Sequence, residues 1–538
     1  MGKGAESVFC VETERLPPYA WTGYTPVMRK LLKFLTGRLF WSAILIVAQV
    51  ALLSYLIYSR AGSDYTVERV FLGISLIMTM VVISRDENPA YKIGWILIFM
   101  LFPLYGGFYY ILFGNKKFTG KVSRKLDAFL RGYRRGVRNV HAPDATPMQQ
   151  LEAKDPALSR KAKYISAISG FPLCQRTRVT YYPLGNDWYP EMVASLEGAK
   201  RFILMEFFIL DPGEVWDTVL DILVRKVREG VDVRLMYDDV GTIKFVPNHY
   251  ERQLRAKGLK VVAFNPLKPH LNSRMNSRDH RKVLVVDGNV GYTGGVNLAD
   301  EYVNRRILYG HWKDTAVRLE GEAVGNLTLM FFQLWGYATG EELDFAPFMP
   351  TECQESDGFV QPFGDNPLDN NNVAENSYLS IIGVAKKYVW ITTPYLALDN
   401  EMITALKIAA QSGVDVRIIV PHIPDKWYVF AVTRSYYRQL MASGVRIYEY
   451  TPGFIHAKAI VSDGNVAIIG TINMDYRTFY LNFENGVAFY YCSIVTNVEA
   501  DVRRTMELSH QVGMEEVRST STLRRLGRFL LRLFSPLM

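Results

Sequence analysis

Two stretches of the sequence decide the fold: DHRKVLVVDGNVGYTGGVN at residues 279–297 and IHAKAIVSDGNVAIIGTIN at residues 455–473. In each stretch a run of β-branched residues ends at Asp-Gly-Asn, a turn sequence, and a second apolar run follows. The two stretches align residue for residue without a gap. They indicate an internal duplication. Each copy contains either a β-hairpin or a single strand followed by a tight return of the chain.

Three further pairs of similar segments precede these stretches in the same order. The pairs are AKRFILMEFFILD from Ala199 with AKKYVWITTPYLALD from Ala385, GVDVRLM from Gly230 with GVDVRII from Gly413, and GLKVVAFNP from Gly258 with GVRIYEYTP from Gly444. In both copies short apolar runs alternate with charged amphipathic stretches, as in α/β layer folds. The sequence therefore predicts an α/β protein with two pseudo-symmetric lobes, each a mixed sheet flanked by helices.

The repeats also set the domain organisation of the 538-residue chain. We place the first lobe at residues 151–346 and the second at 377–538, with its C-terminal tail. The stretch 347–376 is rich in Pro, Gly, Asp and Asn, which is typical of a connection between lobes. A basic segment at 121–150 precedes the first lobe.

Residues 1–120 have the composition of a membrane region. Residues 39–58 and 93–113 form two uncharged runs, each long enough to cross a bilayer as a helix. Residues 70–84 form a shorter apolar run that is a possible third crossing. Basic clusters precede the first run and follow the second, so two crossings place both clusters in the cytoplasm and three crossings separate them. We expect a multi-pass protein of the cell membrane, with its lobes on the cytoplasmic face.

The composition limits the classes of partner and cofactor. Lys and Arg number 62 against 53 Asp and Glu, so the partners should be anionic: phosphates, nucleic acid or an acidic membrane. The four cysteines, Cys10, Cys174, Cys353 and Cys492, lie far apart and form no C-x-x-C pair. Neither a disulfide framework nor a zinc site is indicated. We expect no cofactor and no metal in the catalytic site.

The C-terminal tail LRRLGRFLLRLF, from Leu523 to Phe534, has leucines at helical spacing with arginines beside them. A basic amphipathic helix lying on an anionic membrane explains this pattern. A helix packed on its own lobe explains it equally well.

Each duplicated stretch also contains a His, a Lys two residues later and an Asp seven residues later. These residues are His280, Lys282 and Asp287 in the first copy and His456, Lys458 and Asp463 in the second. On a strand, residues i and i+2 share a face, so each His and its Lys project together. If the lobes face each other, two imidazoles and two ammonium groups meet. Such a site suits a phosphodiester, because lysines can neutralise its oxygens while one His attacks phosphorus and the other protonates the leaving oxygen.

Other polar residues near the motifs are candidates for supporting roles. The two motif aspartates either take part in the chemistry or support the turns that they open. Asn297 and Asn473 supply amide donors beside small residues that leave room for a ligand. An attacking imidazole needs an acceptor on its other nitrogen, and two acids, Asp314 and Glu484, lie downstream of the motifs.

Paired H-x-K-x4-D motifs in a duplicated α/β chain resemble the phospholipase D superfamily. The whole layout, including the N-terminal runs, FIHAK, and NMDYRTFYLNFE after the second motif, is similar to bacterial cardiolipin synthases. The resemblance implies two phospholipase D-like lobes that transfer a phosphatidyl group between two phosphatidylglycerol molecules, giving cardiolipin and glycerol through a phosphohistidine. It implies phosphatidylglycerol and anionic lipids as partners, Asp314 and Glu484 as orienting acids, His280 as nucleophile and His456 as acid.

Two alternatives stay open at the level of sequence. A phospholipase D or another phosphatidyltransferase of the same superfamily would use the same core residues, so hydrolysis and transfer are poorly separated. A membrane-tethered basic protein that binds nucleic acid without chemistry is the alternative from another class. The two intact H-x-K pairs disfavour it, whereas salt-sensitive nucleic-acid binding would support it.

Overall fold

The computed structural model of the chain describes residues 145–267, 277–341, 344–355, 358–368 and 371–537 of the two lobes. It also describes residues 65–85 and 88–102 of the N-terminal part, with isolated positions at 44, 47, 51, 54, 55, 106, 107 and 110. The expected first membrane run, 39–58, and the basic segment before residue 145 therefore lie almost entirely outside the described residues.

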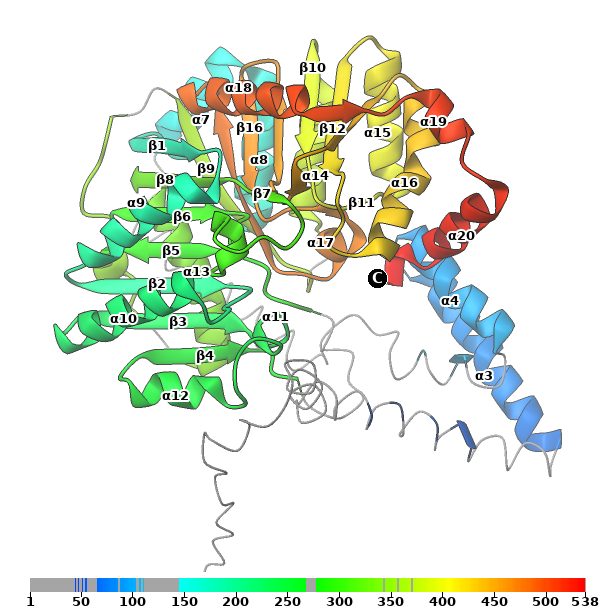
Figure 1. Cartoon of the computed structure of the whole chain (residues 1–538), viewed down its shortest axis with the longest axis horizontal. Coiled ribbons are helices and arrows are strands. Elements are labelled where there is room, and N and C mark those ends of the chain that lie inside the picture. The colour runs from blue at the N-terminus through cyan, green and yellow to red at the C-terminus, as the bar shows by residue number, and fades with distance from the viewer. Residues whose placement is uncertain are drawn as a thin grey trace, which may run out of the picture.

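The first lobe is built on a seven-stranded mixed sheet (Figure 1). Its strands, in spatial order, are β1 (Thr177–Tyr182), β8 (Ala316–Gly321), β6 (Val290–Gly294), β5 (Val283–Val286), β2 (Phe202–Phe207), β3 (Asp232–Asp238) and β4 (Lys260–Phe264). The side chains of β2 alternate between two apolar clusters. Ile203 and Met205 pack with helices α9 (Gly185–Glu197) and α10 (Glu214–Arg228). Phe202 and Leu204 belong to the other cluster, with α13 (Val324–Thr339).

The second lobe repeats this arrangement on an eight-stranded sheet. Its strands, in spatial order, are β19 (Ser509–Gln511), β13 (Arg446–Tyr450), β12 (Asp415–Pro421), β10 (Tyr388–Thr392), β15 (Ala459–Ser462), β16 (Val466–Gly470), β18 (Glu484–Tyr490) and β9 (Phe359–Asp365). Its main helices are α14 (Val373–Val384), α15 (Asn400–Gln411), α16 (Trp427–Met441) and α18 (Ser493–Glu507). Apart from the edge strand β19, each strand has a counterpart at the same place in the first sheet. The predicted α/β fold with two pseudo-symmetric lobes is confirmed.

The duplicated stretches form the expected hairpins, β5–β6 and β15–β16, both antiparallel. In the first turn Asp287 and Gly288 both have positive φ, 53° and 79°, and the N–H of Asn289 donates to the carbonyl of Val286. Two central residues with positive φ match the right-handed twist of the flanking strands. Asp463 and Gly464, with φ of 53° and 69°, repeat this conformation.

The boundaries that we expected between the lobes are wrong in two places. The stretch 347–376 is more than a connection, because it contains β9, which pairs with β18 at the edge of the second sheet. Pro362 made this stretch resemble a loop, yet an edge strand tolerates proline. Helix α8 (Pro156–Ser169), expected in the first lobe, packs on the second: Nε2 of Gln361 donates to the carbonyl of Ala162 at 3.1 Å.

Short pairings join the two lobes. Strand β7 (His311–Lys313) of the first lobe runs parallel to β14 (Gly453–Ile455) of the second. An isolated parallel bridge between Asp279 and Phe483 repeats this pairing at the other motif. Nζ of Lys313 lies 3.0 Å from the carboxylate of Asp501, and both side chains are buried. These pairings fix the position of each motif against the opposite lobe.

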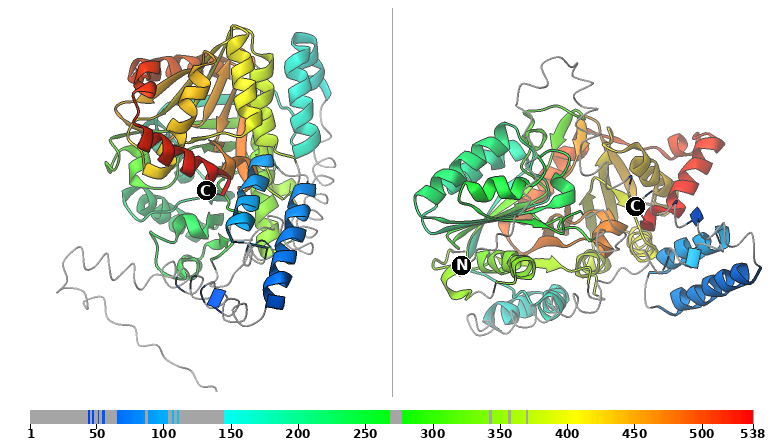
Figure 2. Two further views of the ribbon diagram at one scale, coloured as in Figure 1. Left: turned by 90° about the vertical axis from the view of Figure 1, so that its right-hand side faces the viewer. Right: turned by 90° about the horizontal axis from the view of Figure 1, so that it is seen from below.

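Two N-terminal helices, α3 (Tyr65–Ser84) and α4 (Pro89–Leu101), project from the side of the second lobe, where α4 lies beside the C-terminal helix α20 (Thr522–Leu533) (Figures 1 and 2). The expected short run 70–84 is part of the longer helix α3. Within the expected run 93–113, helix α4 ends at Leu101, because Phe102, which precedes a proline, leaves helical geometry. The described positions 106, 107 and 110 are helical again. Within the described residues, no helix has both the length and the apolar character needed to cross a membrane.

Candidate active site

The first histidine is held between the lobes. His280 precedes β5, and its backbone N–H donates to the carbonyl of Phe483 in the second lobe at 3.0 Å. Its Nδ1 lies 2.9 Å from Oε2 of Glu484, which opens β18. Both side chains are buried. The acid that orients the first-lobe histidine therefore comes from the second lobe.

The second histidine has the equivalent arrangement with the two lobes exchanged. The backbone N–H of His456 donates to the carbonyl of Lys313 at 2.7 Å. Its Nδ1 lies 2.5 Å from Oδ2 of Asp314, a first-lobe residue. The structure thus contains two buried histidine–carboxylate dyads, His280–Glu484 and His456–Asp314, each built from both lobes. Because a carboxylate accepts at Nδ1, each ring keeps Nε2 for a reacting group.

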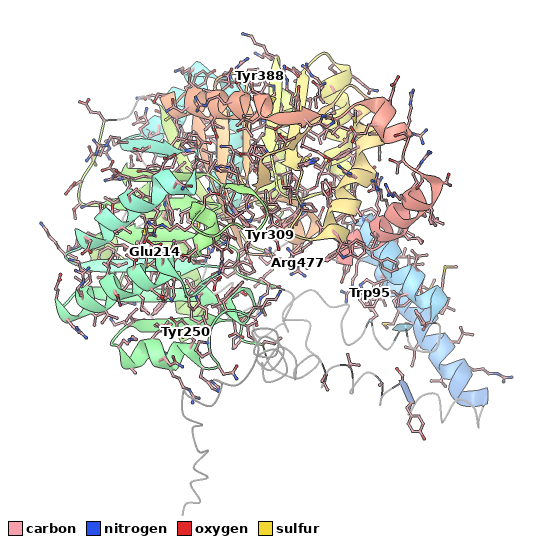
Figure 3. The ribbon with its side chains drawn as sticks, in the orientation of Figure 1. Trp95, Glu214, Tyr250, Tyr309, Tyr388 and Arg477 are labelled. Atoms are coloured by element: carbon pink, nitrogen blue, oxygen red, sulfur yellow. The ribbon has the colours of Figure 1, made fainter. Side chains whose placement is uncertain are left out.

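Aromatic rings fix the orientation of both imidazoles. The ring of Phe208 lies 5.1 Å from that of His280, and the ring of Tyr302 lies 5.3 Å from that of His456, both edge to face. Trp312 also contacts His456, at 5.5 Å. Tyr309, labelled at the junction of the lobes in Figure 3, packs on Trp312 in turn. These contacts hold each imidazole ring in place, so that a substrate can approach it from one direction.

Both motif lysines are buried beside their histidines. Nζ of Lys282 donates to the carbonyl of His280 at 2.7 Å, and Nζ of Lys458 donates to that of His456. Among the described residues each ammonium has only this one acceptor, so N–H donors remain for an anion. Burial lowers the pKa of Lys282 to about 8 and that of Lys458 to about 7. Bound phosphate would favour the charged form of both lysines.

Burial also sets the protonation of the two dyads. It raises the pKa of Asp314 and of Glu484 to about 7 each, although the nearby lysines act in the opposite direction. Burial, together with the nearby lysines, lowers the pKa of both histidines well below the usual value. Each dyad therefore gains or loses one proton near neutral pH, and that proton belongs to the pair rather than to one residue.

The two carboxylates have different surroundings. Glu484 accepts hydrogen bonds from the Thr471 hydroxyl and from Nδ2 of Asn482. At the position of Thr471 the first lobe has Gly295, where an added Cβ would lie 2.0 Å from Oδ1 of Asp314. The near symmetry of the sequence repeat is thus broken beside the reacting groups.

The motif aspartates lie at the far end of each strand from the histidines. Asp287 accepts three backbone N–H groups, from residues 200 to 202, at 2.7–2.9 Å. Asp463 accepts three, from residues 386 to 388, at 2.7–3.0 Å. Of the two roles left open, these contacts favour support of the turn, and the catalytic assignment of both aspartates is corrected accordingly.

The two asparagines differ in their contacts. Nδ2 of Asn297 donates to the hydroxyl of Tyr302 at 2.8 Å, and its Oδ1 accepts the N–H of Ile209 at 3.1 Å. Asn297 therefore holds the tyrosine that packs on His456, and its amide is already used. Asn473 is buried, and its Oδ1 has no hydrogen-bond partner in the described structure.

Two further polar contacts lie near the site, and sequence reasoning missed the first of them. Nδ2 of Asn485 donates across the lobes to the hydroxyl of Thr293 at 2.7 Å. Glu206, a buried carboxylate on β2, pairs with Arg281 at 2.6 Å. Both members of this pair are replaced in the second copy, by Thr392 and Ala457. That joint change between the repeats was the signal that could have found the pair.

Comparisons with known proteins agree with this geometry. The family described as "Cardiolipin synthase, PLD-like domain" matches residues 192–310 and 378–506, and "Phospholipase_D-nuclease N-terminal" matches 73–115. A cardiolipin synthase of Alkalihalophilus pseudofirmus is 34% identical over 88% of this chain and 93% of its own length. One of Geobacillus kaustophilus is 34% identical over 92% and 99%. The fold resembles that of a phosphatidylserine synthase from Haemophilus influenzae (TM-score 0.53, 14% identity, 70% of this chain and 98% of that one).

Proposed function

The chain belongs to the cardiolipin synthase family of the phospholipase D superfamily and is a phosphatidyltransferase, and from this premise we propose that it joins two phosphatidylglycerol molecules into cardiolipin with release of glycerol. The observation that carries the proposal is the pair of buried histidine–carboxylate dyads, each shared between the lobes, beside two buried lysines. This set of groups suits two successive displacements at one phosphodiester.

In the first step of the proposed mechanism, Nε2 of His280 attacks the phosphorus of one phosphatidylglycerol. The bond from phosphorus to the glycerol oxygen breaks, and His456 gives its proton to that oxygen. The phosphatidyl group is then bound to His280 as a phosphohistidine. Lys282 and Lys458 neutralise the charge on the non-bridging oxygens, and this anion favours a proton on the dyad of His456.

In the second step the roles are reversed at the same phosphorus. His456, now neutral, takes the proton of a hydroxyl group of a second phosphatidylglycerol. That oxygen attacks phosphorus, and the bond to His280 breaks to release cardiolipin. The assignment of His280 as nucleophile follows the family resemblance.

The reaction is tested with purified full-length protein and phosphatidylglycerol labelled in its terminal glycerol and in its acyl chains. We expect glycerol and cardiolipin in equal amounts, with little phosphatidic acid. Phosphatidic acid and glycerol without cardiolipin would identify a phospholipase D instead. Binding of nucleic acid without any lipid turnover would support the alternative from another class.

We propose that the lysines, rather than a divalent ion, neutralise the phosphate. Both ammoniums lie beside the reacting imidazoles and retain donors, as described above. Turnover of a soluble short-chain phosphodiester should therefore persist after treatment with EDTA, measured well below the unfolding temperature. Loss of turnover that one specific metal restores would contradict this assignment.

We propose a membrane location, with residues 1–120 as the anchoring region and the lobes on the cytoplasmic face. Exposed apolar side chains on α3 support it, at the helical spacing of Leu72, Leu76, Met80 and Ile83. Helix α20 exposes a second apolar set, with Leu523 79% accessible, next to its arginines. Such a surface suits an anionic bilayer.

Removal of residues 1–113 tests whether the N-terminal part delivers the lipid substrate while the two lobes carry out the reaction. The shortened protein should cleave a soluble short-chain phosphodiester at a rate comparable to that of the full chain, because both dyads lie in the lobes. Its turnover of phosphatidylglycerol in vesicles should fall sharply. A folded shortened protein, judged by circular dichroism, that is inactive on every soluble diester would refute this division.

A further inference from the structure

Three carboxylates gather where the second lobe meets the N-terminal helices, apart from the proposed mechanism. They are Glu375 on α14, Asp399 at the N-cap of α15, and Glu401 in the first turn of α15. One oxygen from each lies within 4.8 Å of the others. In the described part of the chain, no hydrogen bond joins any of them to a histidine of the dyads.

The most buried member of this cluster has an oxygen without a partner. Glu375 is 3% accessible. Its Oε2 accepts a hydrogen bond from Nδ2 of Asn372 at 3.1 Å, whereas Oε1 is buried and has no hydrogen-bond partner among the described residues. A buried carboxylate oxygen in this state is costly unless something else satisfies it.

The other two carboxylates contact the N-terminal part of the chain. Oδ2 of Asp399 accepts the hydroxyl of Tyr480 at 2.6 Å and Nδ2 of Asn88 at 3.2 Å. The same Nδ2 lies 3.5 Å from Oε2 of Glu401. Asn88 is the N-cap of α4, with its Oδ1 bonded to the N–H of Ala90. The cluster therefore joins helix α4 to the second lobe.

An arginine neutralises a different pair of acids in the first lobe: Asp211 and Glu301 share the guanidinium of Arg306. No Lys or Arg among the described residues forms an ion pair with Glu375, Asp399 or Glu401. The described part of the chain therefore supplies no cation to this cluster.

We propose that Glu375, Asp399 and Glu401 bind a hard divalent cation, Ca²⁺ or Mg²⁺, that fastens helix α4 to the second lobe. Carboxylate oxygens are the ligands that these ions prefer. The exposed side of Glu401 leaves space for coordinated water. The cation would neutralise the three acids and satisfy the unpartnered oxygen of Glu375.

Terbium luminescence in the full-length protein tests the site. The protein is stripped with EDTA, transferred to buffer without chelator, and titrated with Tb³⁺ under excitation of its aromatic residues. We expect one saturable site per chain, with Ca²⁺ and Mg²⁺ competing. Tyr480→Phe should lower the emission, because Tyr480 is the aromatic residue hydrogen-bonded to the cluster. The absence of saturable binding would overturn the proposal.

The decisive variant is Glu375→Gln, with Glu507→Gln, an exposed position on α18, as matched control. Glutamine matches the size of Glu375 without its charge, so the variant should unfold no lower than the wild type when no ion is present. Its affinity for Tb³⁺ and Ca²⁺ should fall at least tenfold, and Ca²⁺ should no longer raise its unfolding temperature. Wild-type affinity in Glu375→Gln would place the bound ion elsewhere and overturn the proposal.

Discussion

Replacement of His456 by alanine should reduce turnover of phosphatidylglycerol by roughly 10⁴-fold or more, yet leave a burst of nitrophenol from an activated phosphodiester. The glycerol alkoxide has a high pKa and needs a proton as it leaves, whereas a nitrophenolate departs unassisted. With His456 absent, His280 can still attack the activated substrate, and the covalent adduct accumulates because no group activates the acceptor hydroxyl.

His280→Ala is the matched variant, since the two histidines have equivalent positions in the repeat. It should give no burst with either substrate, because the nucleophile is needed whatever the leaving group. The burst is measured by stopped-flow absorbance, and the adduct by acid-labile phosphate on the protein. The opposite pattern would exchange the two roles. A full burst from both variants would exclude a phosphohistidine.

Asp314→Asn should reduce kcat/KM for phosphatidylglycerol at pH 7 by roughly 10³-fold, although Asp314 touches no substrate in the proposed mechanism. Its carboxylate accepts a hydrogen bond from Nδ1 of His456 at 2.5 Å and stabilises the imidazolium that acts as the acid. An amide at this position cannot share a proton in the same way. The loss should be much smaller with the nitrophenyl diester, which needs no acid.

The pH dependence distinguishes the two dyads. Burial raises the pKa of Asp314 and of Glu484 to about 7. As the pH rises through that value, the His456–Asp314 dyad loses the proton that the leaving group needs. As the pH falls through it, the His280–Glu484 dyad gains a proton and the nucleophile is lost. Wild-type kcat/KM should therefore follow a narrow bell centred near neutral pH.

A single substitution in either dyad should change one side of the bell-shaped pH profile of kcat/KM. Asp314→Asn should move the alkaline side to lower pH, because His456 alone has a strongly lowered pKa. Glu484→Gln should alter the acid side and lose activity with both substrates, since it acts on the nucleophile. Asp344→Asn, at an exposed first-lobe carboxylate, is the control and should keep the wild-type profile. Identical profiles for the two dyad variants would contradict the division of roles.

The local sequence pattern was enough to predict the two hairpins next to the motif His and Lys residues. The Asp-Gly-Asn turns, the β-branched runs and the i, i+2 spacing of His and Lys depend on backbone preferences over a few residues, and the repeat showed each of them twice. The motif aspartates illustrate the limit of such reasoning. Asp287 and Asp463 belong to the same motif as the histidines, but their partners are N–H groups about 80 residues away in sequence, at the start of β2 and β10.

The sequence by itself determined the duplication, the α/β class, the two hairpins and the position of each motif His beside its Lys, because periodicity and turn chemistry act locally. Only the tertiary structure decided that Glu484 orients His280 and Asp314 orients His456, that β9 completes the second sheet, and that Glu375 meets Asp399 and Asn88. These contacts join residues up to about 300 positions apart. Their pairing follows from how the two lobes pack around a shared apolar core, which no short window of sequence encodes.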